Sequence, residues 1–266
     1  MFIKEQRFPP TGDFMDNSIF LENARKKIKE GWSVDDVIRK LIMLSDSIEK
    51  AENILFEQVY DVYFLYYPEA ASVLKERDKF IDLIEKAVDR HSLIQSLQIS
   101  EDSMGYDLDG EDLQLLSFSV NELKNISDLK KLVDERLYNL VSENYPNFSA
   151  ILGQEIAAKM IYLGKKGRSL ALMTSSKLQV LGAEKAMFAS RKKKTTPKYG
   201  VIYNHDALVK VNDNLKGKAA KIVASCALLA IKTDVFSKED KRKEISEKMN
   251  KNLSKLVGNN GNKKSY

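Results

Sequence analysis

The sequence predicts an all-α fold in which a long antiparallel intramolecular coiled coil is followed by a compact C-terminal helical domain. Three observations predict it: charged residues with few turn residues, two long apolar series at helical spacing, and a change of texture after residue 146. Charged residues make up 30% of the 266, and only 12 Gly and 5 Pro punctuate the chain. A many-stranded sheet needs more tight turns than these residues supply, so long helices are favoured.

The first long helix is predicted by apolar residues that recur at intervals of seven. Ser33 is its expected N-cap, and Pro68 closes its end. A seam sustained over more than four heptads is typical of a coiled-coil helix. The two parallel sets of the seam are Val34, Leu41, Ile48, Leu55 and Val62, and, three positions later, Val37, Leu44, Ala51, Gln58 and Leu65.

A second apolar series predicts the antiparallel partner helix. Its members advance in steps of three or four and end before Pro146. An acidic helical stretch, 69–90, and a looser connector around 100–105 let the chain turn around and come back. The series is Leu113, Leu116, Val120, Leu123, Ile126, Leu129, Val133, Leu137 and Leu140.

Four regions follow from this pattern. They are a short N-terminal remnant at 1–33, a coiled-coil domain at 34–146, a compact helical domain at 147–236 and a charged extension at 237–266. Small apolar residues interleaved with Lys mark the compact domain, whose last helix we expect to end near 234–236. The extension is expected to be helical in part, with a disordered polar tail at 258–266.

The net charge of +5 hides a strong asymmetry along the chain. Residues 1–146 hold 18 Lys and Arg against 29 Asp and Glu, whereas residues 147–266 hold 25 against 9. So basic a C-terminal part favours contact with a polyanion such as the phosphate backbone of RNA. The alternative is a lysine-rich surface that is merely solvated.

Several classes of function are disfavoured. Cys226 lies in an apolar run and is expected to be buried, so we expect no disulfide, no cysteine-based metal site and a reducing environment. No segment has the roughly 18 uninterrupted apolar residues of a membrane span, and a cytoplasmic location is expected. With two His, no Gly-rich phosphate loop and no carboxylate cluster in the basic half, we expect no enzyme, cofactor or metal.

The densest motif is the stretch 178–188, Leu-Gln-Val-Leu-Gly-Ala-Glu-Lys-Ala-Met-Phe, with a basic loop directly after it. Gly182 and Ala183 would let a backbone approach another surface closely. Amides exposed at a helix N-terminus attract phosphate, as do the cations of the loop. The motif therefore favours an RNA-binding surface.

This motif, followed by Pro197-Lys198-Tyr199-Gly200, resembles the signature of the Nop domain. The resemblance extends back through Asn147–Lys159 and forward through Leu215–Lys221 to the apolar helix that reaches Asp234. It also takes in the predicted coiled coil with its Tyr67-Pro68-Glu69 close, about 200 residues in all from Val34 to Phe236. The sequence is thus similar to archaeal Nop-type scaffold proteins of box C/D ribonucleoproteins.

The resemblance implies a function without chemistry. Such scaffolds join a box C/D guide RNA and its small kink-turn-binding, ribosomal-type protein to fibrillarin, the S-adenosylmethionine-dependent enzyme of rRNA 2′-O-methylation in ribosome biogenesis. Their coiled coil pairs with a second copy. The RNA contacts implied for this sequence are Gln179, Gly182, Ala183, Glu184, Lys185, Arg191, Lys192, Lys193, Lys194, Lys198, Tyr199, Lys216, Lys218 and Lys221.

An aromatic cluster near the end of the first long helix is expected at the tip of the coiled coil. We predict protein contact and dimerisation there rather than base stacking. The cluster consists of Tyr60, Tyr63, Phe64, Tyr66 and Tyr67.

The sequence departs from the family in two places. Tyr199 stands where His is usual, which replaces an imidazole by a phenol that can stack on a base or reach phosphate. Only residues 1–33 precede the coiled coil, where the family has a fibrillarin-binding domain of more than 100 residues. The chain is then a piece of a longer protein, a short family member, or a paralogue unable to recruit fibrillarin. A coiled-coil protein-interaction module remains the other alternative.

Overall fold

The predicted all-α fold is confirmed. A computed structural model describes residues 17–86, 88–97, 102–184, 186, 188 and 197–261, and no strand occurs within these ranges. The helices are α1 (Asn17–Gly31), α2 (Val34–Tyr66), α3 (Pro68–Val73), α4 (Arg77–Lys86), α5 (Arg90–Leu97), α6 (Gly110–Asn144), α7 (Pro146–Leu152), α8 (Gln154–Gly164), α9 (Gly167–Ala171), α10 (Ser175–Gln179), the 3-10 turn η1 (Val201–Asn204), α12 (Asp206–Val209), α13 (Asp213–Lys232), the π turn η2 (Thr233–Ser237) and α14 (Arg242–Gly261).

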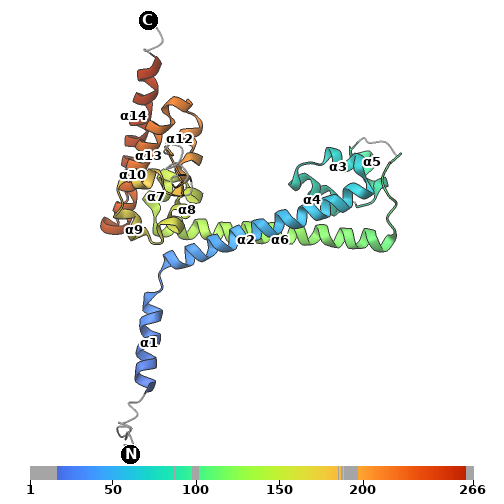
Figure 1. The fold of residues 1–266 in the computed structure, drawn as a ribbon, viewed down its shortest axis with the longest axis horizontal. Coiled ribbons are helices and arrows are strands. Elements are labelled where there is room, and N and C mark those ends of the chain that lie inside the picture. The colour runs from blue at the N-terminus through green and yellow to red at the C-terminus, as the bar shows by residue number, and fades with distance from the viewer. Residues whose placement is uncertain are drawn as a thin grey trace, which may run out of the picture.

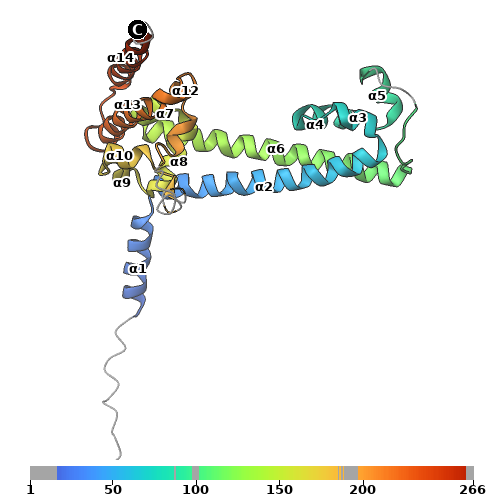
Figure 2. The ribbon, with the colours of Figure 1, turned by 45° about the horizontal axis from the view of Figure 1, so that its top comes forward.

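The molecule is an elongated hairpin with a helical bundle at one end and a smaller cluster of helices at the other. Figures 1 and 2 show α2 and α6 side by side along the rod. Helices α7 to α14 form the bundle at its base, and α3, α4 and α5 fold over its far end. Helix α1 points away from both.

Contacts between distant residues establish that α2 and α6 are antiparallel. At the base, the Tyr145 hydroxyl donates to Asp35 Oδ1 at 2.5 Å. Halfway along, the Ser45 hydroxyl donates to Asp134 Oδ1 at 2.5 Å. At the far end, the Tyr106 amide donates to the Leu65 carbonyl at 2.8 Å. As the residue numbers rise along α2, the numbers of their partners fall, so the two helices are antiparallel, as predicted.

The start of α2 is also as predicted. The Ser33 amide and hydroxyl both donate to Asp36 Oδ2, at 3.0 and 2.8 Å. This contact ties the N-cap to the first turn. The helix ends at Tyr66, before Pro68.

The seam predicted for α2 is wrong by one residue. The face packed against α6 contains Asp35, Ile38, Ile42, Ser45 and Glu52, each at most 8% exposed. The predicted apolar set lies one position earlier and points largely outward, since Val34, Val37, Leu44, Val62 and Leu65 are 40–58% exposed. Of that set, Ile48 is buried. Helix α2 therefore has a buried inner seam with both apolar and polar members and an exposed, apolar outer stripe.

The inner seam differs from the predicted one because some of its members are polar residues with partners across the fold. Asp35 accepts from Tyr145 and also from the Gly167 amide, at 3.1 Å. Glu52, only 1% exposed, lies 3.6 Å from the Arg77 guanidinium, although its Oε2 accepts no hydrogen bond from a described residue. Burying a polar group costs little once it is hydrogen-bonded, as Asp35 is, and an ion pair offsets part of the cost for Glu52. A pattern that counts apolar residues alone cannot detect such positions.

The series predicted for α6 fits the structure better. Leu116, Val120, Leu123, Val133, Leu137 and Leu140 are buried, whereas Leu129 is 48% exposed. The acidic stretch expected at 69–90 forms two short helices, α3 and α4, and α5 begins at its last residue.

The aromatic cluster at the tip packs within the chain. Tyr63 and Tyr67 are fully buried, and Tyr66 is 6% exposed. The Tyr60 hydroxyl donates to the Ala71 carbonyl at 2.5 Å. Of the five residues predicted for dimerisation, Phe64 is the one that is largely exposed, at 49%. The other four hold α3 and α4 against α2.

The bundle is built on small residues. Ala157, Ala158, Ala219, Ala220, Ala224 and Ala227 are buried at the contacts between helices, where short side chains allow close approach. The charged extension belongs to the same core, because Ile245 and Met249 of α14 are buried in it. Helix α14 continues to Gly261, four residues into the tail expected to be disordered. Cys226 is buried, as predicted.

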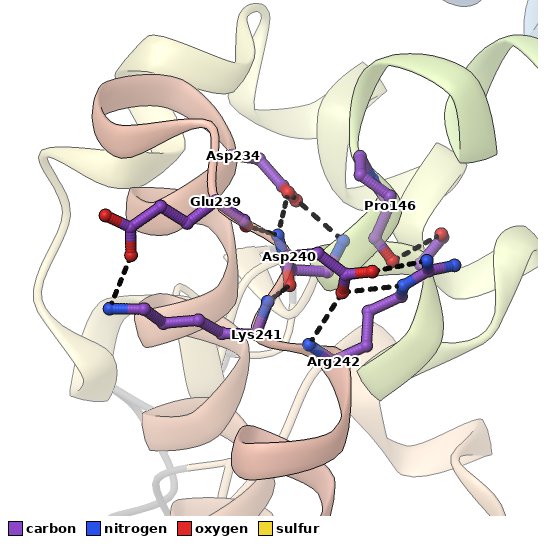
Figure 3. Close-up of polar contacts among 8 residues, drawn as sticks. Pro146, Asp234, Glu239, Asp240, Lys241 and Arg242 are labelled. Atoms are coloured by element: carbon purple, nitrogen blue, oxygen red, sulfur yellow. Dashed lines mark hydrogen bonds and ion pairs between the residues drawn. The ribbon is translucent and has the colours of Figure 1, made fainter.

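A buried carboxylate joins three segments at the corner of the bundle, shown in Figure 3 beside Pro146. Asp234 accepts from the Asn147 amide and side chain, at 3.1 and 2.6 Å, and from the Phe148 amide at 2.8 Å. The Asn147 side chain in turn bonds the Glu239 carbonyl and the Lys241 amide. Burial raises the pKa of Asp234, against the effect of these donors. The corner fixes α7 to the end of α13 and to the start of α14.

Candidate nucleic-acid interface

The Gly182 turn that follows α10 makes a close approach within the chain itself, and approach to another surface stays a prediction. Gly182 has φ +88, and a Cβ there would lie 2.6 Å from Cγ2 of Val201, so only glycine fits without strain. The Gly182 amide donates to Glu184 Oε1 at 3.0 Å. The Glu184 carboxylate therefore occupies the position at this amide that a phosphate would take. The Ala183 amide is also bonded, because it donates to the Val180 carbonyl.

Gln179 clamps three segments of this surface together. Its side-chain amide donates to the Lys198 carbonyl at 2.7 Å and to the Gly217 carbonyl at 3.4 Å. The Gly200 amide returns a bond to the Gln179 carbonyl at 2.9 Å. The half-buried Gln179 thus places Lys198 next to the first turns of α13. Lys198 itself is exposed.

Two tyrosines and a lysine form the aromatic part of the surface. The rings of Tyr199 and Tyr203 stack with centroids 4.9 Å apart and planes 18° apart. The Lys216 ammonium lies 5.1 Å from the centroid of the Tyr203 ring and 2.8 Å from Asp213 Oδ1. The hydrogen bond to Asp213 raises the pKa of Lys216, which keeps the ammonium charged beside the rings. Aromatic rings beside cations are typical of surfaces that bind single-stranded RNA.

Tyr203 was not among the residues selected from the sequence. It is 44% exposed and links Tyr199 to Lys216. A spacing of four between Tyr199 and Tyr203 could have suggested a shared side, but the stack depends on the turn η1, which the sequence did not predict.

The predicted residues fall into two groups in space. Gln179, Gly182, Lys198, Tyr199 and Lys216 lie together, and we call this set with Tyr203 the Tyr-Lys surface. Along α13, Lys218 and Lys221 are rotated about 160° and about 140° from Lys216, since each residue advances the helix by about 100°. Both are exposed, and Lys221 faces a groove beside α14. Lys185 and Arg191, Lys192, Lys193 and Lys194 lie outside the described residues.

His205 has a structural role next to this surface. It is 9% exposed, its Nε2 lies 2.8 Å from the Ile151 carbonyl, and its Nδ1 accepts from the Ala207 amide at 3.1 Å. These two bonds place the proton on Nε2 and make His205 the N-cap of α12.

Within the described ranges, no three His, Cys, Asp or Glu side chains are grouped so that they could hold a metal ion. None of the described helices combines the length and the apolar character needed to cross a bilayer.

Comparison with known proteins identifies similar sequences over most of the chain. The model of the Nop family, described as a snoRNA binding domain, fibrillarin, matches residues 44–258. A NOP5 family protein of Methanocaldococcus jannaschii is 28% identical over 251 residues, which are 88% of this chain and 60% of that protein. Nucleolar protein 58 of Schizosaccharomyces pombe is 28% identical over 82% of this chain and 46% of its own length.

A further relative and one solved structure agree with these matches. Nucleolar protein 56 of Caenorhabditis elegans is 24% identical over 80% of this chain and 49% of its own length. The chain therefore spans about half the length of these curated relatives. A chain in the crystal structure of a fibrillarin/Nop5p complex is 17% identical, with a TM-score of 0.55, and the match covers 95% of this chain and 88% of that one. That likeness shows a shared fold.

Proposed function

Because the chain belongs to the Nop family, we propose that it is a non-catalytic scaffold of box C/D guide-RNA particles. In this role it binds the composite of a kink-turn RNA and its small binding protein, and supports RNA-guided 2′-O-methylation of rRNA. The relatives named nucleolar protein 56 and 58 support the assignment to ribonucleoproteins. The predicted cytoplasmic location belongs to the same proposal.

The observation that carries the RNA part is the Tyr-Lys surface. Lys198 supplies an exposed cation and Lys216 a cation paired with Asp213, and the stacked rings of Tyr199 and Tyr203 supply an aromatic patch next to Lys216. Phosphate contacts give affinity that depends on salt, and aromatic rings receive unpaired bases. Lys185 and Arg191–Lys194, which belong to the same basic motif, lie outside the residues that the structure describes.

Recognition of a second protein is supported by the Gly182 turn. Gly182 and Glu184 are exposed at the edge of the Tyr-Lys surface, so a carboxylate and a bare backbone lie next to the cations. An RNA phosphate would be repelled by Glu184, whereas a protein amide or ammonium would be attracted to it. We therefore place the small kink-turn-binding protein at Glu184 and the RNA at Lys198 and Lys216.

Pairing with a second copy is supported by the outer stripe of α2 rather than by the buried tip aromatics. The stripe keeps the heptad spacing of a coiled coil and remains exposed at Val34, Val37, Leu44, Val62 and Leu65. Near the tip it adjoins a groove of about 290 Å³ between α2 and α6, lined by Leu55, Val62 and Leu115 among others. Exposed apolar surface of this extent is typical of a protein interface.

Fibrillarin is named in the description of the family model and in that of the matching crystal structure, so its recruitment is a proposal separate from RNA binding. The chain covers 60% of the NOP5 family protein and less of the nucleolar proteins. We propose that residues 34–261 act in RNA binding and pairing. The alternative is that this chain is a short paralogue that does not bind fibrillarin. An RNA-binding test does not separate the two, because the Tyr-Lys surface is the same in both cases.

The decisive experiment is a gel-shift titration on a kink-turn RNA, with and without the small kink-turn-binding protein, at two salt concentrations. We expect a supershift only in the presence of that protein, weakened by salt. Lys198→Ala and Lys216→Ala should each reduce affinity by about tenfold, since a charge-assisted contact contributes about 1.5 kcal/mol. Glu184→Ala should weaken the supershift.

Lys251→Ala is the matched control, because Lys251 is an exposed lysine of the same basic half that lies on α14. Its affinity should equal that of the unaltered chain. No RNA-dependent shift in either condition would refute the scaffold and leave the coiled-coil interaction module as the better account.

Pairing is tested by sedimentation of variants with equal exposure. Leu44 and Met43 are both 46% exposed, but only Leu44 belongs to the outer stripe. Leu44→Glu should convert a dimer to a monomer at micromolar concentration, and Met43→Glu should leave the dimer intact. Equal sedimentation of both variants would contradict pairing through the stripe.

A further inference from the structure

A second exposed surface lies on the other side of α13 from Lys216. It is a groove of about 460 Å³ between α13 and α14. Ile222, Cys226, Leu228 and Leu229 form its apolar floor, and Lys221, Lys232 and Lys248 are its charged members; we call it the Lys-rimmed groove. Ser225 and Asn252 complete its lining.

The groove arises from the way the two helices pack. Ile245 and Met249 of α14 face the core, so Lys248 and Asn252 are turned to one side. On α13 the residues at positions 221, 225, 228, 229 and 232 share a side, because they recur every three or four residues. The side chains of that row are not covered by α14, and Leu229 is 38% exposed.

The charged residues that line the groove are all lysines. Lys221, Lys232 and Lys248 are exposed, and no carboxylate is among the lining residues. None of these three ammonium groups forms an ion pair with any residue that the structure describes. The field over the groove is therefore positive, and an acidic partner complements it.

We propose that the Lys-rimmed groove receives an acidic amphipathic helix of a partner protein. A helix lays apolar residues at i, i+3 or i+4 and i+7 into a groove between two helices. Its carboxylates then meet the lysines, whose aliphatic stems add apolar contact. This contact does not depend on RNA binding, because the Tyr-Lys surface lies about 140° around α13 from Lys221.

The floor favours protein over RNA as the occupant. Its side chains are aliphatic, and no aromatic residue lines the groove. Unpaired bases bind by stacking on aromatic rings, which this groove does not offer, whereas the Tyr-Lys surface does.

The test uses a synthetic helical peptide of about 20 residues, with leucines at i, i+3, i+4 and i+7 and glutamates on both flanks. Fluorescence anisotropy measures its binding to the full chain. The same peptide with lysines in place of glutamates, and an oligouridine strand, serve as competing probes. We expect binding of the acidic peptide that weakens with salt, and weaker binding of the basic peptide and of the RNA to this groove.

Two variants locate the binding. Leu229→Glu places a carboxylate on the apolar floor and should reduce peptide affinity at least about tenfold. Lys248→Glu should reduce it about threefold to tenfold and lessen its salt dependence. Leu172→Glu and Lys251→Glu, at exposed positions that do not line the groove, should bind as the unaltered chain does.

The single cysteine gives an independent readout. Cys226 lines the groove and is 4% exposed, so an occupant should slow its alkylation further.

Equal affinity of Leu229→Glu and Leu172→Glu, or no protection of Cys226 by a saturating peptide, would overturn the proposal. Loss of oligouridine binding in Leu229→Glu would instead assign the groove to RNA. Kink-turn gel shifts of Leu229→Glu and Lys248→Glu, expected to be unchanged, separate failure here from failure of the scaffold.

Discussion

The cores at the two ends of the hairpin are packed from side chains of different size. At the tip, the buried residues are large rings, and Phe80 meets Tyr63 edge to face at 5.3 Å and Phe56 at 5.7 Å. In the bundle, buried alanines of α8 and α13 let helices approach closely. A few large side chains suffice to fix short helices to a rod, whereas close-packed helices distribute stability over many small contacts.

Polar contacts differ between the same two regions. The bundle has a buried carboxylate, Asp234, at the corner where three segments meet. At the tip, Arg90 lies over the Tyr66 ring, 4.5 Å from its centroid, and donates to the Tyr66 carbonyl. Removing a ring should therefore harm the tip most, and removing a carboxylate should harm the bundle most.

The largest effect is expected from Phe80→Ala. Phe80 is fully buried among three rings, so truncation should cost about 3–5 kcal/mol of local stability. Hydrogen exchange should increase in α3 and α4 and remain unchanged in α7 and α13. Phe64→Ala is the control, because its ring is 49% exposed and its loss should change stability by less than about 0.5 kcal/mol.

Asp234→Ala should destabilise the bundle and leave the stability of the tip unchanged. It leaves the amides of Asn147 and Phe148 buried without their acceptor, which should cost about 3 kcal/mol. Hydrogen exchange in α7 and α14 should rise while exchange in α4 stays the same. Asp234→Asn retains one carbonyl oxygen and should lose roughly half as much, as measured by urea unfolding. Equal protection of α7 in all three chains would show that the corner does not hold it.

Tyr145→Phe should have the smallest effect, at the junction of the hairpin and the bundle. Losing the hydroxyl that donates to Asp35 should cost about 1–2 kcal/mol at pH 7. Burial and the bond to Asp35 raise the pKa of Tyr145 above its ordinary value of 10.0. The folded state thus favours the protonated phenol, and this stabilisation is complete below pH 10 and lost as the pH rises beyond it.

Urea unfolding of both chains at pH 7 and at pH 10.5 measures this difference. The gap in free energy of unfolding between the unaltered chain and Tyr145→Phe should narrow at the higher pH. The other tyrosines and lysines titrate alike in both chains, so the difference isolates Tyr145. A gap that widens with pH would contradict the direction of the pKa shift.

Sequence periodicity predicted the two helices of the rod and the buried face of α6, though not that of α2, because these signals are local. The Ser33 cap, the end of α2 before Pro68, the apolar series of α6 and the small residues of the bundle all depend on neighbours within a few turns. The positive φ of Gly182 and its contact with Val201 were not predicted, since both depend on the later segment of the chain that contains Val201.

The helical class, the hairpin, the split of charge and the Nop motif could be predicted, because they follow from composition and short-range spacing. The face of α2 that meets α6 could not, since Ser45 joins that seam through Asp134, 89 residues away. Contacts between distant segments also turn the tip tyrosines inward, stack Tyr203 on Tyr199 and separate Lys216 from Lys221. Each of these depends on which partner a side chain meets across the fold, and a spacing pattern contains no such information.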